Sequence, residues 1–138
     1  MTSNRPISAR HRRTRQDHST ETAEDYVEAV AEITEENGTC RVVDLAQRFD
    51  VSHVTVTRIV GRLKKAGYLE TEPYRPIHLT DQGARLAAES KRRHDIVYAF
   101  LISIGVSEKT AAIDAEGIEH HVSPETLERF RKLTENKK

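Results

Sequence analysis

Two carboxylates and an imidazole stand close together in the C-terminal part of the sequence. Glu116, Glu119 and His120 occupy positions i, i+3 and i+4, so on a helix their side chains share one face and lie about 5 to 6 Å apart. Oxygen and imidazole donors on one rigid element are suited to holding a divalent cation. The alternative is a solvated acidic face, which is common on helices. We expect a metal site here.

A second carboxylate pair, Asp25 and Glu28, stands at i and i+3 of another predicted helix, and His94 on a third could complete the ligand set. The pair alone is more often merely solvated. The donors are oxygen-rich, include imidazole and lack sulfur, which favours Mn²⁺ or Fe²⁺ over structural zinc. Cys40 is the single cysteine and makes a poor thiolate site by itself. Because there are more donors than one ion needs, two ions sharing ligands are expected.

Helices must position these donors, and apolar periodicity predicts most of the chain to be helical. Tyr26, Val27 and Val30 mark a helix that ends near Asn37, and Ser52 is a good N-cap for a later one. Two short β-type runs, at 68–71 and 77–79, suit a hairpin. The remaining helices are predicted at 42–49, 53–66, 80–104, 108–121 and from 124 onward.

A short helix, a tight turn, a longer helix and a hairpin are the order of elements in a winged helix-turn-helix. The longer helix should turn Val54, Val56 or Ile59, Val60 and Leu63 inward. Its polar faces and the hairpin tip offer groups that suit base edges and phosphates. The alternative is an ordinary solvated helix. The predicted DNA-contacting residues are Ser52, His53, Thr55, Thr57, Arg58, Arg62, Lys65 and Arg75.

The charges are strongly segregated, although the formal net charge of the 138 residues is zero. Residues 1–16 carry five arginines and no acid, and residues 21–36 carry seven acids and no Lys or Arg. Residues 52–93 carry nine Lys or Arg against four acids, as expected of a DNA-binding region. Residues 1–18 are predicted to be a disordered basic arm. Because no apolar run is long enough for a membrane span or secretory signal, a cytoplasmic protein without membrane contact is expected.

The residues just described resemble the diphtheria toxin repressor family over most of the chain. The strings that carry the resemblance are Ala23–Glu28, Val42–Leu69, Arg93-His94 and Asp114–Ser123. In the manganese-responsive branch of that family the metal ligands match six residues of this chain. All are present: Asp25, Glu28, His94, Glu116, Glu119 and His120. In the iron-responsive branch the positions of Asp25 and Glu116 hold Met and Cys, so the resemblance implies manganese.

The resemblance implies a homodimer in which Mn²⁺ acts as corepressor on a palindromic double-stranded operator upstream of manganese-uptake genes. The expected architecture is mainly α with a small β-hairpin. After the arm come a winged helix-turn-helix domain at 19–79 and a helical dimerisation and metal-binding region at 80–138. The alternatives are a winged-helix regulator that responds to Fe²⁺ or to a non-metal signal, a metalloenzyme, and a DNA-coating protein. An enzyme is not expected, because no nucleophile stands beside a base.

Overall fold

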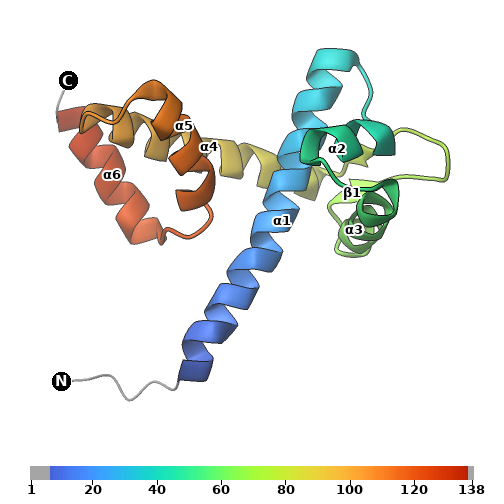
Figure 1. Cartoon of the computed structure of the whole chain (residues 1–138), viewed down its shortest axis with the longest axis horizontal. Helices are drawn as coiled ribbons and strands as arrows, with labels where there is room; N and C mark the ends of the chain where they lie inside the picture. The colour runs from blue at the N-terminus through green and yellow to red at the C-terminus, as the bar shows by residue number, and fades with distance from the viewer. Residues whose placement is uncertain (1–6, 137–138) are drawn as a thin grey trace. The chain divides into compact units, whose positions relative to one another are not determined.

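The computed structural model describes the backbone of residues 7–136 and the side chains of residues 20–136. Within this part the chain is mainly helical with one small antiparallel sheet, which confirms the predicted fold class (Figure 1). None of the described helices combines the length and apolar character that a bilayer crossing requires. The elements are α1 (Ile7–Asn37), α2 (Val42–Phe49), α3 (His53–Lys65), β1 (Leu69–Glu70), β2 (His78–Leu79), α4 (Asp81–Ser103), α5 (Glu108–Ile118) and α6 (Pro124–Asn136).

The chain forms two compact units. One contains residues 23–93, which we call the wing unit, and the other combines the described part of residues 1–22 with residues 94 onward, which we call the helical unit. The wing unit holds the second half of α1, all of α2, α3 and the hairpin, and the first half of α4. Both α1 and α4 therefore belong in part to each unit.

Helix α1 is longer than the sequence indicates. It begins at Ile7 instead of near Ser19, so the disordered arm predicted for residues 1–18 is replaced by helix from residue 7 onward. Residues 1–6 lie outside the described residues. The physical reason is that extending a helix costs far less than starting one. Between Ile7 and the packed segment there is no proline or glycine to stop the extension.

The wing unit is built around an apolar core from α1, α2, α3 and the hairpin. Val27, Leu45 and Val56 are fully buried there, and the rings of Tyr26 and Phe49 stack with centroids 4.4 Å apart. Leu45 and Ala46 face inward from α2. In Figure 1 both α2 and α3 lie beside the C-terminal part of α1. This core orients α3 and leaves its polar face toward solvent.

Helix α3 starts and stops where its sequence predicts. The Ser52 hydroxyl accepts a hydrogen bond from the Thr55 amide, and Gly67 just beyond the helix has a φ of 92°, a conformation that favours glycine. Val54 was expected on the inner face but is 78% exposed. It lies in the first turn, where α3 projects beyond the core, while Val56 and Val60 supply the buried contacts.

The hairpin pairs only two residues from each strand. Leu69 lies opposite Leu79 and Glu70 opposite His78, and the amide of Ile77 donates to the carbonyl of Cys40, 2.7 Å away. Tyr74, in the connecting loop, is fully exposed and has a φ of 64°. Such short pairing gives little stability by itself, so the loop needs other anchors.

The helical unit is smaller and has fewer buried apolar residues. In the described part, Val97, Ala115 and Leu127 form its buried core, and the rings of Phe100 and Phe130 stack 4.2 Å apart. Figure 1 shows α5 and α6 beside the later part of α4. Ser107 caps α5, because its hydroxyl accepts a hydrogen bond from the Thr110 amide. Because this apolar core is small, charged side chains lie close to it near the end of α5.

Candidate metal centre and DNA-binding surface

His94 of α4 meets two carboxylates from the end of α5. Its Nδ1 lies 2.9 Å from Oε2 of Glu119 and 3.2 Å from Oε1 of Glu116. All three residues belong to the helical unit, and their ligand atoms lie within 4.8 Å of one another. The side chain of Glu119 is fully buried, whereas 56% of the Glu116 side chain is exposed. The centre is therefore open on the Glu116 side.

Small residues let α5 approach α4 closely enough for Glu116 and Glu119 to reach His94. Ala111 and Ala115 are fully buried on the inner face of α5, and neither side chain holds the helix away from α4. The helix ends at Ile118 and not near His121 as predicted, with Glu119 as the C-cap and His120 in the turn that follows. The following Ser123-Pro124 cap starts α6, which leaves only a short turn for the chain to change direction.

Because α5 ends before Glu119, the predicted ligands are arranged differently from three donors on one helix face. Nε2 of His120 lies 3.4 Å from Oε1 of Glu119, while the other oxygen of Glu119 faces His94. One buried carboxylate thus stands between two imidazoles. The prediction of three donors on a single helix face is corrected to two donors at the helix end and one in the turn.

Asp25 and Glu28 lie on α1 in the wing unit. The carboxylate of Glu28 accepts a short hydrogen bond from the hydroxyl of Ser90 on α4, which belongs to the same unit. Asp25 is half-buried. Of the six predicted ligands, the helical unit brings together His94, Glu116, Glu119 and His120, and the wing unit holds the other two.

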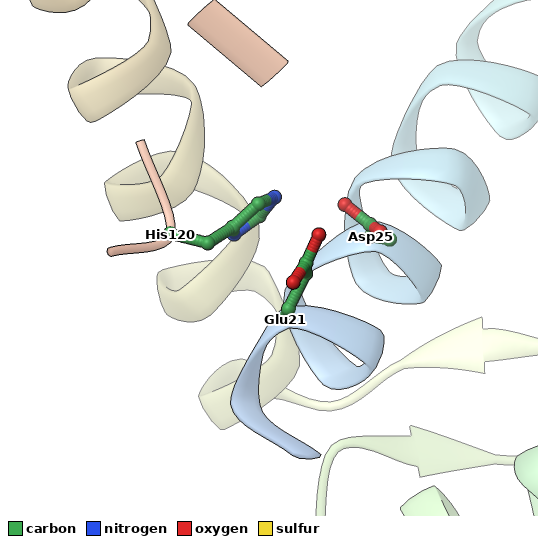
Figure 2. Close-up of side chains that lie close together, drawn as sticks. All are labelled: Glu21, Asp25 and His120. Carbon is green, nitrogen blue, oxygen red and sulfur yellow. The ribbon is translucent and has the colours of Figure 1, made fainter. Parts of the chain in front are cut away.

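Two further acids beside these residues were not predicted to take part. Oε2 of Glu24, a buried residue, lies 2.5 Å from Nη2 of Arg93. Oε2 of Glu21 lies 3.2 Å from Nε2 of His121. The burial of Glu24 could have been predicted from its position one residue after Ala23, at the edge of the apolar stripe of α1. Glu21 is one turn before Asp25 on α1, as Figure 2 shows.

The donors of the helical unit fit a divalent cation. Among the described residues, Nδ1 of His94 is buried without a hydrogen bond of ordinary geometry, although two carboxylate oxygens lie within 3.2 Å of it. Oxygen and imidazole donors suit Mn²⁺ and Fe²⁺. Cys40 is no thiolate ligand, because burial, reinforced by the Asp44 carboxylate, raises the pKa of its thiol to about 11.

The residues predicted to contact DNA lie on the outer face of α3 and on the hairpin loop. Thr55 is partly buried, because its amide and hydroxyl bond the Ser52 side chain at the start of the helix. Ser52 itself is exposed but acts as the cap. The remaining predicted contacts are all exposed and within one unit: His53, Thr57, Arg58, Arg62, Lys65 and Arg75.

Two cations hold the loop of the hairpin against α2 and α3. Nη1 of Arg41 donates to the carbonyl of Tyr74 at 3.1 Å, and Nζ of Lys64 donates to the carbonyl of Thr71 at 2.9 Å. A groove of about 780 Å³ runs between α3 and this loop. Arg41 and Lys64 were not among the predicted functional residues. Their role follows from contacts across the fold, which no local pattern reveals.

A winged helix-turn-helix in one unit and a cluster of metal-type donors in the other are the two parts of a metal-responsive DNA-binding regulator. Residues 18–77 match the profile of the iron dependent repressor N-terminal DNA binding domain, and residues 80–138 match that of the iron dependent repressor metal binding and dimerisation domain. The chain belongs to the iron dependent repressor family, which confirms the resemblance found in its sequence. The members of this family are transcriptional regulators.

Curated relatives agree over most of the chain. The transcriptional regulator MntR of Escherichia coli O157:H7 is 46% identical over 124 residues, which cover 90% of this chain and 80% of the relative. The HTH-type transcriptional regulator MntR of Bacillus subtilis (strain 168) is 38% identical over 117 residues, covering 85% and 82% respectively.

Solved structures with the same fold include proteins described as manganese regulators. A "manganese-dependent transcriptional repressor complex with manganese" has a TM-score of 0.73 at 27% identity, over 82% of this chain and 52% of that one. The manganese regulator SloR has a TM-score of 0.71 at 25% identity, over 82% and 53%. This chain thus spans about half the length of these solved chains.

Proposed function

We propose that this protein is a manganese-dependent transcriptional repressor that binds operator DNA when Mn²⁺ is bound. The observation that carries the proposal is the buried carboxylate of Glu119 between the imidazoles of His94 and His120, at 2.9 and 3.4 Å. In a chain of this family, that arrangement is a centre for a divalent cation. The names of the relatives and the solved manganese regulators support Mn²⁺ as the ion.

The proposed ligand set joins the four donors of the helical unit to Asp25 and Glu28, which the family resemblance supplies. A bound divalent cation would supply the positive charge that holds several carboxylates and imidazoles together. Glu119 is suited to share its two oxygens between two ions, because they face different histidines. We therefore propose two ions per subunit.

The donor atoms favour a hard cation over metals that select sulfur, and the names of the relatives favour Mn²⁺ over Fe²⁺. The four donors in the helical unit are carboxylate oxygens and imidazole nitrogens, and the one cysteine of the chain is a buried thiol. Hard oxygen ligands suit Mn²⁺, while soft sulfur ligands would select other metals. A response to Fe²⁺ or to a non-metal signal is the second candidate, and no observation favours it.

The switch we propose is a coupling between metal ligands and recognition helices. Without a cation, the carboxylates of Glu116 and Glu119 repel each other, and no ion connects the donors of the two units. Joining them restricts how α3 is presented to DNA, since α1 and α4 run through both units. Couplings of this kind are commonly about 1 to 3 kcal/mol.

A homodimer is the proposed working form. The helical unit leaves several large apolar side chains exposed, among them Ile104 at 50% and Ile113 at 65%, and the matching family domain is a dimerisation domain. Two recognition helices related by a two-fold axis suit a palindromic operator. The proposed DNA contacts are the exposed residues of α3 and Arg75 of the loop. We propose that the protein acts on manganese-uptake genes in the cytoplasm.

Binding to DNA with and without the ion tests this function. A duplex is first selected from random sequence with the Mn²⁺-loaded protein, and its affinity is then measured by fluorescence anisotropy with Mn²⁺ and with excess chelator. We expect at least a fivefold loss in chelator, which corresponds to about 1 kcal/mol. Equal affinity in both conditions would contradict the proposal.

A matched pair of variants on α5 connects the response to the metal centre. Glu116→Gln removes a donor, whereas Glu108→Gln changes an equally exposed carboxylate in the first turn of the same helix. Mn²⁺ stoichiometry and the anisotropy response should fall in the first variant and stay unchanged in the second. An unchanged stoichiometry in Glu116→Gln would remove this residue from the ligand set.

A further inference from the structure

Glu21 forms a cluster with His120 and His121 inside the helical unit. Its Oε2 lies 3.2 Å from Nε2 of His121, and a carboxylate oxygen of Glu21 lies within 4.8 Å of a ring nitrogen of His120. Figure 2 shows the Glu21 carboxylate and the His120 ring close together, with Asp25 one turn further along α1. All three members belong to one unit. The proposed ligand set makes no use of Glu21.

The spacing suits one ion shared by Glu21 and His120. Two ligand atoms at about 2.1 Å from the same octahedral ion lie roughly 3 to 4.2 Å apart. The Glu21 oxygen and the His120 nitrogen lie within 4.8 Å of each other, so a small movement of the Glu21 side chain brings them into that range. The side chain of Glu21 is 28% exposed, so its carboxylate can move, while that of His120 is 1% exposed and held by its surroundings.

His121 supplies what a ligand carboxylate usually has, which is a partner that orients it. Metal-bound carboxylates are normally hydrogen-bonded by a neighbouring group, and the Nε2 of His121 is in position to donate to Oε2 of Glu21. A lone surface pair of this kind would add little stability and nothing else. Here His121 also orients the Glu21 carboxylate near the imidazole of His120.

We propose that Glu21 is an additional carboxylate ligand of the ion held by His120, and that His121 is its positioning residue. This inference rests on the proposed function, since it concerns the same metal centre. It gives the centre a contact on the first part of α1. Because α1 continues without a break from Ile7 to Asn37 into the wing unit, a ligand at Glu21 connects metal binding directly to the helix that packs in the DNA-binding core.

The test is Mn²⁺ binding by the full-length, metal-free protein, measured by isothermal titration and by the electron paramagnetic resonance signal of free Mn²⁺. Glu21→Gln keeps the shape of the side chain and removes the charged donor. We expect the affinity for one of its Mn²⁺ ions to fall about tenfold or more. His121→Asn should give a smaller loss, and Glu21→Asp should recover part of the wild-type affinity. The matched control is Glu125→Gln, an exposed carboxylate of α6, which should titrate as wild type.

Each outcome decides the inference. If Glu21→Gln and wild type give superimposable titrations, Glu21 is no ligand and the inference is overturned, while the proposed function stands. If the wild type itself takes up no stoichiometric Mn²⁺, both fail. Circular dichroism checks the fold of each variant. Should Glu21→Gln lose helix, the comparison passes to Glu21→Asp, whose affinity must then fall below that of wild type; equal affinity would overturn the inference.

Discussion

The two units of this protein are stabilised in different ways. The wing unit has a continuous apolar core that includes Val27, Leu45, Val56, Leu69 and Ile77, each at most 1% exposed. In the described part of the helical unit, the buried apolar cluster is small and consists of Val97, Ala115 and Leu127, and the buried Glu119 lies close to two histidines. The wing unit thus has an apolar core of its own. The helical unit has a smaller apolar cluster and buries a charged side chain next to it.

The difference indicates which part of the molecule responds to the signal. Apolar burial contributes about 25 cal/mol per Å² whatever the metal concentration, so the wing unit should keep its shape in either state. A cluster of carboxylates is costly without a cation to neutralise it. The helical unit should therefore gain most of its order on metal binding. The predictions below follow from this contrast.

The largest expected effects come from matched truncations in the two cores. Leu45→Ala should destabilise the wing unit by about 2 to 5 kcal/mol, and Mn²⁺ should restore less of this loss than it restores for a truncation in the helical unit. Leu127→Ala should destabilise the helical unit, and Mn²⁺ at 100 times its dissociation constant should restore about 2.7 kcal/mol. Hydrogen exchange followed by mass spectrometry reports on each unit separately. Equal recovery of the two variants in Mn²⁺, or none for Leu127→Ala, would show that the units are not distinct in this way.

Within the wing unit, two valines two residues apart on α3 should behave differently. Val56→Ala empties part of the core and should cost about 2 kcal/mol, because Val56 is fully buried. Val54→Ala should change the free energy of unfolding by less than about 0.5 kcal/mol, because Val54 is 78% exposed. Urea unfolding measures both. A large loss in Val54→Ala would mean that the first turn of α3 is covered in solution.

The loop of the hairpin is the exception inside the wing unit, because side chains and not a core hold it. Lys64→Met removes the hydrogen bond to the Thr71 carbonyl and should weaken operator binding by about 1 kcal/mol, roughly fivefold. The affinity for Mn²⁺ should not change. Arg85→Met, an exposed cation on α4, is the control for loss of charge alone. Equal losses in the two variants would assign the effect to charge and not to the loop.

A further expected effect is a pH dependence confined to the wing unit. Burial raises the pKa of the Cys40 thiol from 9.0 to about 11. Below pH 9 the thiol is protonated in both folded and unfolded chains, so its contribution is constant. Between pH 9 and 11 the unfolded chain loses this proton first, and stability falls as pH rises. Urea unfolding at several pH values should show a shallower fall in Cys40→Ala. Identical slopes would mean that Cys40 is not protected from solvent.

Much of the fold could be predicted because its signals are local. Ser52, Ser107 and Ser123 each accept a hydrogen bond at a predicted helix start, and Gly67 and Gly105 take positive φ where helices were expected to stop. Capping and glycine conformation depend on a few neighbouring residues. The start of α1 was missed because helix extension depends on what the following segment packs against.

The amino-acid sequence by itself determined the kinds of donor at the metal centre and the order of elements that carry them. His94, Glu116, Glu119 and His120 were all identifiable from residue type and spacing. Only the tertiary structure decided that α5 ends at Ile118, that Glu119 turns one oxygen to each of two histidines, and that Glu21 lies beside His121. Helical spacing relates residues within one element, whereas the direction of a side chain at a helix end depends on packing against residues far away in the chain.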